Sequence, residues 1–481
     1  MVKKEEDRTD KYIKALEEEL CASIEREKKY SEEYLDFKTY ATKRIKRTKL
    51  YKNIISDPDS KMGKVVRAPR SFYRIIKNPE VYKSLVQKKT VNNDSVGEVD
   101  DGHFLDPWMV SLENREKIAK NALKEGKRLA LYFVEKPDSS TFRYRCYNTF
   151  TATKDSKKWQ AVYFFKNELE TVKELLPESS ILVFGRQSGQ EKIIDKLVKL
   201  AHENEKKVGL DIDDLVFDIN YLNVVLDTIG EKTNKSYWLS YFMSVQAMAK
   251  KMDFFVTTNK FLAGKLEKSF NKPCGVIRNS INREQINASL VYLTKKEKRD
   301  EAGFVMGYFS GSPTHEKDFN VAQPEIIKFL DEHEDATLVI VGYMRFFGVA
   351  KELMEKNRIR FLPFTDFRKL QRLMAEVDVN IAPLVINDFT NCKSELKFFE
   401  AAIVETTTIA SPTYTFKNAI TDGKNGFLAQ PGEWYDKLEY LYKHPKENQK
   451  IAKAAREYAL KHYYGKEFLK EVEEAYDFFA K

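Results

Sequence analysis

The stretch NCKSELKFFEAAIVETTTIAS, residues 391–411, predicts a helix, a turn and a strand. Its first half places apolar residues three or four positions apart, which forms one apolar face of a helix: Cys392, Leu396, Phe399 and Ile403. Ser394 is the candidate N-cap of this helix. Residues 406–410 are β-branched or apolar and predict a buried parallel strand. The stretch therefore indicates an α/β fold.

A further strand is expected shortly before this stretch, at residues 379–384 (VNIAPL). Four polar residues then lie at or near the start of a helix that follows a strand: Lys393, Ser394, Lys397 and Glu400. Ligands of open α/β sheets bind at this place, and the N–H groups and dipole of a helix start suit a phosphate. The alternative interpretation is an ordinary helix of a Rossmann-like domain with solvated charges.

This stretch resembles the nucleotide-sugar site of retaining glycosyltransferases of family 4. That family has two glutamates eight positions apart, then an alanine, a turn and a strand that ends in Ala-Ser. Glu400 and the run at 409–411 match, whereas the position of the first glutamate is Cys392. The resemblance implies that Glu400 binds the donor ribose, since a carboxylate accepts hydrogen bonds from two adjacent hydroxyls.

A second motif resembles the first strand and loop of the C-terminal domain in the same family. It is the run GYFSGSPTHEKDF at 307–319, whose glycine lets backbone N–H groups approach a diphosphate. The resemblance implies donor binding by Gly311, Ser312 and Lys317; the alternative is a tight Gly-Ser-Pro turn. In the family the region of Phe364 contacts the nucleobase, and the run DGKNGFL at 422–428 is a structural turn.

Residues 296–481 are predicted to form this C-terminal, nucleotide-sugar domain. Its strands are expected at residues 304–309, 337–342, 360–364, 379–384 and 406–410, and residues 434–481 are expected to be helical. The resemblance implies that the last helix crosses back to the N-terminal domain.

Residues 126–295 are predicted to form an N-terminal, acceptor-binding Rossmann-like domain. Short apolar runs alternate with helical segments, which specifies a parallel sheet. The predicted strands are residues 129–135, 161–164, 181–184, 208–210, 254–257 and 274–277.

Two arginines follow the first of these strands. The resemblance places the loop after this strand at the interdomain cleft, so Arg143 and Arg145 are candidates for contact with an acceptor phosphate or the donor diphosphate. A structural salt bridge is the competing interpretation.

Three aspartates follow the fourth strand, in the run DIDD at 211–214. A DxD sequence after a strand can chelate Mg²⁺ or Mn²⁺. In the two-domain fold that the resemblance implies, this loop faces the donor sugar, so we expect Asp213 to bond sugar hydroxyls and Asp214 to contact the acceptor. We expect no metal and no other cofactor.

Composition limits the remaining possibilities. A chain of 481 residues with 42% hydrophobic residues suggests two to four domains. The charged start and the lack of an apolar run of 18 residues predict no signal peptide and no membrane span, hence a cytoplasmic location. Four dispersed cysteines and six histidines argue against structural zinc and disulfides.

The net charge of +9 is compatible with nucleic acid, acidic lipid or phosphate-bearing ligands. The sequence contains no recognisable nucleic-acid-binding module, so no nucleic-acid partner is expected.

Residues 1–125 are predicted to be a helical extension. Residues 5–50 lack Gly and Pro and predict a long helix, which either forms a coiled coil between copies of the chain or packs on its own protein. Residues 43–77 alternate basic with apolar or aromatic residues, a pattern that suits an anionic membrane surface. A solvated basic face is the alternative. Residues 89–106 are expected to be a linker.

The resemblance spans about residues 127–470 and is strongest at 303–430. It implies a GT-B fold, with two Rossmann-like domains facing a cleft, and a retaining hexosyl- or deoxyhexosyltransferase that extends a lipid-linked bacterial surface polysaccharide. Lys317, Lys393 and Lys397 would neutralise the leaving diphosphate, with Lys317, Lys393 and Asp213 as the catalytic candidates. The alternatives are a GT-B epimerase or phosphorylase-like enzyme, and a catalytically degenerate scaffold for other glycosyltransferases.

Overall fold

The structure is a computed structural model that describes residues 110–135, 141–186, 192–229, 234–296, 303–310, 316–342 and 351–480. The predicted N-terminal helix, basic-aromatic segments and linker lie outside these ranges. So do Gly311 and Ser312.

The first domain has a parallel sheet of six strands within the described residues, in the order β2-β1-β3-β4-β5-β6. The strands are β1 (Arg128–Val134), β2 (Trp159–Phe165), β3 (Ile181–Gly185), β4 (Lys207–Asp211), β5 (Phe254–Thr257) and β6 (Cys274–Val276). The helices are α7 (Leu112–Lys124), α8 (Asn148–Thr153), α9 (Leu169–Leu175), α10 (Lys192–Glu203), α11 (Leu222–Ile229), α12 (Lys235–Lys251) and α13 (Lys260–Phe270). Helix α14 (Arg283–Lys296), which the predicted boundary at residue 295 assigns to this domain, packs instead on α18 (Phe367–Ala375) of the second domain. A π-helix, Arg143–Tyr147, precedes α8.

The second domain has another parallel sheet of six described strands, in the order β12-β11-β10-β7-β8-β9. The strands are β7 (Phe304–Ser310), β8 (Ala336–Gly342), β9 (Ile359–Leu362), β10 (Val379–Ala382), β11 (Thr407–Ala410) and β12 (Phe427–Leu428). The helices are α15 (Glu316–Asn320), α16 (Gln323–Glu332), α17 (Lys351–Glu355), α18 (Phe367–Ala375), α19 (Asp388–Asn391), α20 (Leu396–Ala402), α21 (Tyr414–Ala419), α22 (Trp434–Lys443), α23 (Pro445–His462) and α24 (Gly465–Phe479). These two Rossmann-like units are the GT-B architecture, and the predicted fold class is confirmed.

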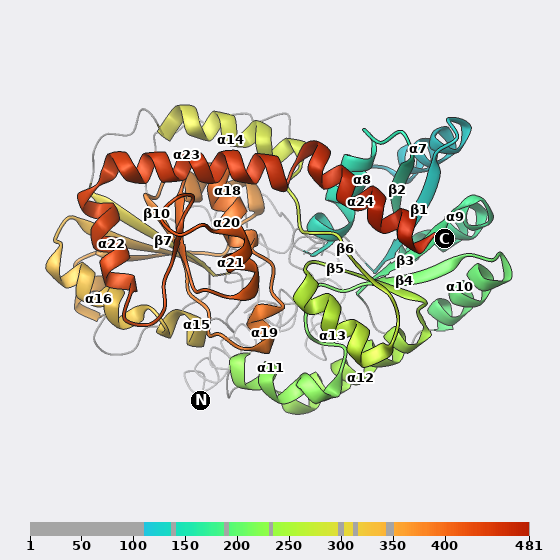
Figure 1. The fold of residues 1–481 in the computed structure, drawn as a ribbon, viewed down its shortest axis with the longest axis horizontal. Helices are drawn as coiled ribbons and strands as arrows, with labels where there is room; N and C mark the ends of the chain where they lie inside the picture. The colour runs from blue at the N-terminus through green and yellow to red at the C-terminus, as the bar shows by residue number, and fades with distance from the viewer. Residues whose placement is uncertain are drawn as a thin grey trace, which may run out of the picture. The chain divides into compact units, whose positions relative to one another are not determined.

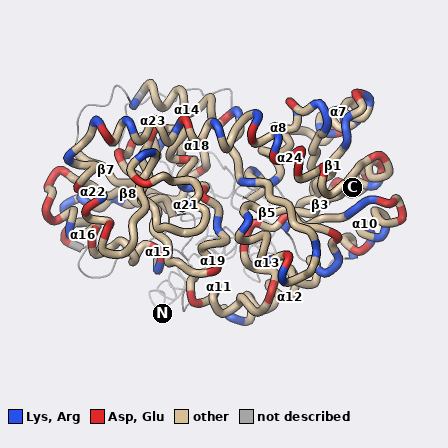
Figure 2. The backbone as a smooth tube through the Cα atoms, viewed as in Figure 1, with Lys and Arg blue, Asp and Glu red and all other residues tan. Residues whose placement is uncertain are grey.

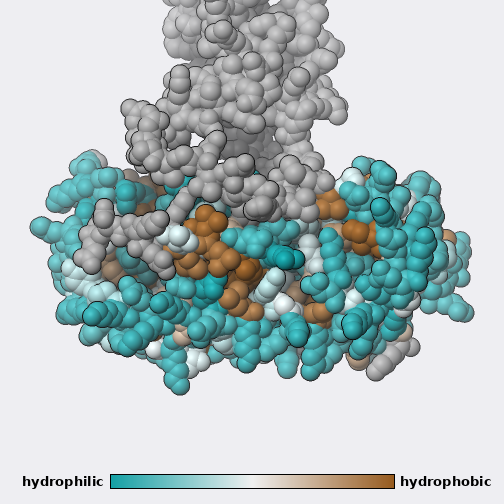
Figure 3. Space-filling view, turned by 90° about the horizontal axis from the view of Figure 1, so that it is seen from above, coloured by the Kyte–Doolittle hydropathy of each residue, from teal (hydrophilic) through white to brown (hydrophobic). Residues whose placement is uncertain are grey.

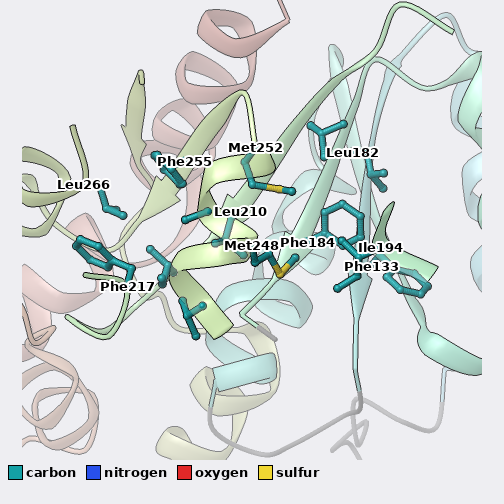
Figure 4. Packing of buried hydrophobic residues seen from close by; sticks show 14 of the residues in the cluster. Phe133, Leu182, Phe184, Ile194, Leu210, Phe217, Met248, Met252, Phe255 and Leu266 are labelled. Atoms are coloured by element: carbon teal, nitrogen blue, oxygen red, sulfur yellow. The ribbon is translucent and has the colours of Figure 1, made fainter. Parts of the chain in front are cut away.

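Each sheet is covered on both faces, which explains why its strands are continuous apolar runs. In β1 the odd-numbered residues 129–133 lie in one core and the even-numbered residues 130–134 in the other. Figure 4 shows the first of these cores, where Phe133, Phe184 and Met248 pack between the sheet and its helices. Burial of one such side chain contributes about 1.5–3 kcal/mol.

The last helix of the chain lies against the first domain (Figure 1). The rings of Phe479 and Phe254 stack with centroids 4.0 Å apart, and the Tyr476 hydroxyl donates a hydrogen bond to that of Tyr132. Helix α23 instead packs on α20 and β11 of the second domain. The two last helices therefore connect the domains.

Helix α7 belongs with the first sheet, although the predicted domain boundary at residue 126 falls after it. Arg115 of α7 donates to the Tyr163 carbonyl at 2.7 Å and pairs with Glu168 at 2.6 Å. The boundary prediction missed this helix because the preceding sequence is polar, while the anchoring contacts are about 50 residues away.

The predicted helix, whose apolar face includes Cys392, is shorter in the structure: α20 begins at Leu396, and a separate short helix, α19, ends at Asn391. Cys392 is the C-cap of α19, and Glu395, not Ser394, is the N-cap of α20. The carbonyl of Cys392 accepts a hydrogen bond at 2.9 Å from the Asn259 side chain of the first domain. Lys393 and Ser394 consequently lie in the connection between the two helices.

Charged residues of both signs are distributed over both domains (Figure 2). Figure 3 shows one face that is mainly hydrophilic, with hydrophobic side chains gathered near its middle. Large exposed apolar side chains include Met243, Leu290 and Phe478, each slightly more than half exposed.

Candidate functional site

The central feature of the candidate site is the amino group of Lys397, in the first turn of α20. The nitrogen is buried and has no hydrogen-bond partner among the described residues. It lies 4.9 Å from the centroid of the Tyr308 ring. Burial lowers the pKa of Lys397 to about 8, although Asp318 and Glu400 act in the opposite direction; Lys393 lowers it further. A buried cation without a hydrogen bond is costly, so this position suits an anionic ligand.

Lys393 contacts the first domain. Its amino group lies 2.8 Å from one carboxylate oxygen of Asp214, which follows β4. The other oxygen of Asp214 lies 2.9 Å from the Arg186 guanidinium, and Asp213 lies 3.1 Å from the same nitrogen. The hydroxyl of Thr141 donates to Asp213 at 3.3 Å. Burial raises the pKa of Asp214, but Lys393 and Arg186 together bring that pKa below its usual range.

Glu400 also contacts the first domain. One of its carboxylate oxygens accepts hydrogen bonds from the Tyr144 hydroxyl and, at 3.3 Å, from Arg143. The Arg143 guanidinium lies 4.2 Å from the Tyr144 ring centroid and 4.3 Å from that of Phe367. The predicted ribose-binding carboxylate is therefore oriented by two residues of the predicted acceptor domain.

Two further residues of the 391–411 stretch meet the first domain. The Ser394 hydroxyl accepts a hydrogen bond from Asn279 at 2.8 Å. Cys392, at the position of the first family glutamate, is buried, and burial raises the pKa of its thiol. A buried neutral thiol does not provide the strong acceptor that a carboxylate offers to a sugar hydroxyl.

The structure does not bring all the predicted donor-binding residues together. The side chain of Lys317 is exposed and donates at 2.6 Å to the carbonyl of Asp227, in α11 of the first domain. Phe364 follows β9 and is 40% exposed. The loop with Gly311 and Ser312 lies outside the described residues.

Arg145, predicted to contact a phosphate, is paired within the first domain. Its Nε and Nη2 donate to the two oxygens of Asp211 at 2.7 and 3.1 Å. Its Nη1 donates to the Ile277 carbonyl at 2.5 Å and to Asn279 at 3.1 Å. The competing interpretation, a structural salt bridge, describes this geometry, and Arg145 and Asp211 are both buried.

Three residues of the site were not among the predicted site residues: Tyr144, Arg186 and Asp318. Arg186 directly follows β3, and the position of residues 185–188 after a strand does predict that they face the cleft, although it assigns Arg186 no ligand. Asp318 is adjacent to Lys317, is buried, and accepts at 3.0 Å from the backbone N–H of Val385. Nothing in the sequence pattern indicated that Tyr144 meets Glu400, because the two are 256 positions apart.

Within the described ranges, no three His, Cys, Asp or Glu side chains are grouped closely enough to bind a metal ion. The absence of a metal in the reaction stays a prediction. None of the described helices combines the length and the apolar character needed to cross a membrane.

Residues 305–444 match the family model described as "Glycosyl transferases group 1". The match includes β7 to β12, and with them Lys393, Lys397 and Glu400. These residues of the second domain are therefore similar to a group 1 glycosyltransferase domain. No curated protein matches the chain.

Several solved structures are similar in fold. Anabaena Alr3699/HepE, determined in complex with UDP, is 15% identical with a TM-score of 0.46, and the alignment covers 73% of this chain and 99% of that one. A glycosyltransferase from Rickettsia africae is 13% identical with a TM-score of 0.49, covering 74% and 99%. Sucrose-phosphate synthase from Thermosynechococcus elongatus is 11% identical with a TM-score of 0.48, covering 73% and 98%. The group 1 domain, set in a pair of Rossmann-like domains, supports a glycosyltransferase with the GT-B fold.

Proposed function

We propose that the protein transfers a sugar from a nucleotide-sugar donor to a growing, lipid-linked surface glycan, with retention of configuration and without a metal ion. The observation that carries this proposal is the buried amino group of Lys397, which has no hydrogen-bond partner among the described residues. Within a glycosyltransferase domain, the anion that such a cation would meet is the donor diphosphate.

The leaving group supplies the chemical reason for these cations. Negative charge grows on the diphosphate as the bond to the sugar breaks, so a cation placed there stabilises the transition state more than the ground state. Lys393 and Lys397 lie on one short segment, and Lys393 contributes to the lowered pKa of Lys397. Lys317 would stabilise the leaving diphosphate only if its amino group released the Asp227 carbonyl, to which it donates a hydrogen bond.

The donor ribose is assigned to Glu400. Its carboxylate is a strong acceptor, and Tyr144 and Arg143 orient it. Retention and the family 4 assignment are supported by the resemblance of residues 391–411. The lipid-linked acceptor and a position at the inner face of the membrane are supported by the basic-aromatic pattern at residues 43–77.

A thermal-shift screen with nucleotide sugars tests the proposal. A donor present at about 100 times its Kd stabilises the folded protein by about 2.7 kcal/mol. We expect one nucleotide sugar to stabilise the chain, and a glycan acceptor then to give a product whose anomeric configuration matches that of the donor. Proton NMR of the anomeric signal measures this configuration.

The alternatives give different outcomes. Donor conversion without a new linkage would favour the epimerase or phosphorylase-like enzyme. Donor binding with no turnover on any acceptor would favour the degenerate scaffold, for which Cys392 in place of a glutamate is the motivating feature. Failure of every nucleotide sugar to bind would contradict the proposed function.

A further inference from the structure

We infer that Asp214 competes with the donor diphosphate for Lys393, so that this aspartate tunes the affinity of the site for the leaving nucleotide. This inference rests on the proposed function and assigns Asp214 a role other than acceptor binding. The contact joins the loop after β4 in the first domain to the segment between α19 and α20 in the second, with 2.8 Å between Oδ1 and Nζ.

The geometry allows Asp214 to release Lys393 while its own negative charge stays paired with another cation. Its second carboxylate oxygen is paired with Arg186 at 2.9 Å, and the same guanidinium lies 3.1 Å from Asp213. An aspartate with a single cationic partner would be left as an unpaired, half-buried charge on release, which is costly. Asp214 would instead remain paired with Arg186 when Lys393 turns to a phosphate.

A diphosphate has an advantage over this carboxylate because of Lys397. Asp214 bonds to Lys393, and no bond joins it to the buried amino group of Lys397. A diphosphate has two charged phosphoryl groups, so we expect one to contact Lys393 and the other to contact Lys397. A singly charged anion or a monophosphate would have to displace the same aspartate but would form fewer contacts with the two lysines. The competition therefore favours binding of a diphosphate over either of them.

Asp214→Asn tests this inference, and Asp213→Asn is the matched control. Both changes remove one charge from the Arg186 cluster, but only Asp214 touches Lys393. Binding is measured by isothermal titration calorimetry at fixed ionic strength. The probes are UDP, GDP, ADP, the three corresponding monophosphates and inorganic pyrophosphate.

We expect Asp214→Asn to bind the preferred nucleoside diphosphate about two- to fivefold more tightly than the wild type, the range for removing one partly buried ion pair. Asp213→Asn should bind these probes like the wild type, because none of them carries the donor sugar that Asp213 is expected to bond. Asp214→Glu should restore wild-type affinity because it returns the charge. The wild type should bind the diphosphate more tightly than the monophosphate. In Asp214→Asn the ratio of these two affinities should be smaller. Asp214→Ser provides a second neutral variant if the asparagine protein does not fold.

The outcomes separate this inference from the proposed function. If the wild type binds a diphosphate and the neutral variants bind it equally or more weakly, the competition does not exist, while the donor site stands. A selective loss of nucleotide-sugar affinity with unchanged diphosphate affinity would make Asp214 a sugar-binding residue instead. If the wild type binds no nucleoside diphosphate, pyrophosphate or nucleotide sugar, both this inference and the proposed function are wrong.

Discussion

The hydroxyl of Tyr144, in the first domain, donates a hydrogen bond to the carboxylate of Glu400, in the second domain. Arg143 reaches the same oxygen at 3.3 Å, and the Tyr144 ring packs at 6.1 Å between centroids against Phe399, the neighbour of Glu400. The carboxylate proposed to bind the donor thus receives its orientation from the opposite domain. Domain arrangement and donor binding are therefore expected to be coupled.

Glu400→Gln should weaken nucleotide binding through the ribose. The amide keeps one acceptor oxygen but loses the charge that strengthens its hydrogen bonds, and Arg143 loses its carboxylate partner. We expect about a tenfold loss of affinity for the nucleoside diphosphate, the scale of a charge-assisted hydrogen bond. Pyrophosphate, which lacks ribose, is the control ligand and should bind as before. Equal losses for both ligands would mean that Glu400 acts through the fold and not on the ribose.

Lys397→Met should separate stability from binding. Methionine has a similar length and fills the space beside Tyr308, but it removes a buried charge with no hydrogen-bond partner among the described residues. Replacing such a charge by an apolar group is expected to be neutral or stabilising. We therefore expect an unchanged or higher Tm in the absence of ligand, together with loss of the thermal shift caused by the diphosphate. A lower Tm together with a wild-type thermal shift on addition of the diphosphate would show that Lys397 does not bind the ligand.

The pKa of Lys397 predicts a pH dependence. Its folded-state pKa is about 8, below the ordinary value of 10.5, so this group costs stability at pH 7, and that cost disappears as pH rises from about 8 to 10.5. Diphosphate binding needs the protonated form, so affinity should fall as pH rises through 8. Calorimetry in buffers of different ionisation enthalpy should show proton uptake on binding near pH 8, and Lys397→Met should abolish it. Binding without proton uptake would contradict the assignment.

Arg145→Met decides between the two interpretations left open for this arginine. In the structure Arg145 is paired with the buried Asp211, so its removal leaves an uncompensated carboxylate. We expect a loss of about 3–5 kcal/mol in the free energy of unfolding, the usual effect of breaking a buried ion pair. Denaturant unfolding measures this loss, and changing Asp211 to Leu at the same time should recover part of it. A variant of normal stability with impaired acceptor use would instead support the acceptor-binding prediction.

Chelation tests the prediction that no metal takes part. We expect activity to persist in excess EDTA, because the proposed function assigns the charge of the diphosphate to Lys393 and Lys397 and not to a metal ion. If EDTA abolishes turnover and Mn²⁺ restores it, Asp211 and Asp213 become the metal ligands. In that case the role given to Asp214 would also need revision.

The sequence by itself determined the two parallel sheets and the segment that carries the site. Each predicted strand was a short apolar run, and the structure has a strand at each of them because a strand covered on both faces must be apolar along its length. The alternation of strands and helices then indicated that Lys393, Lys397 and Glu400 lie near the carboxyl ends of the strands, where open α/β sheets bind their ligands. These features depend on local patterns, which the sequence contains in full.

Only the tertiary structure decided which charged and polar side chains contact one another. Glu400 meets Tyr144, Lys393 meets Asp214, and Arg145 meets Asp211, across 256, 179 and 66 positions of the chain. The carbonyl of Cys392 likewise accepts its side-chain hydrogen bond from a distant part of the chain, from Asn259. Periodicity reports which face of an element is buried, but a charge or a carbonyl finds its partner only when distant elements are packed together.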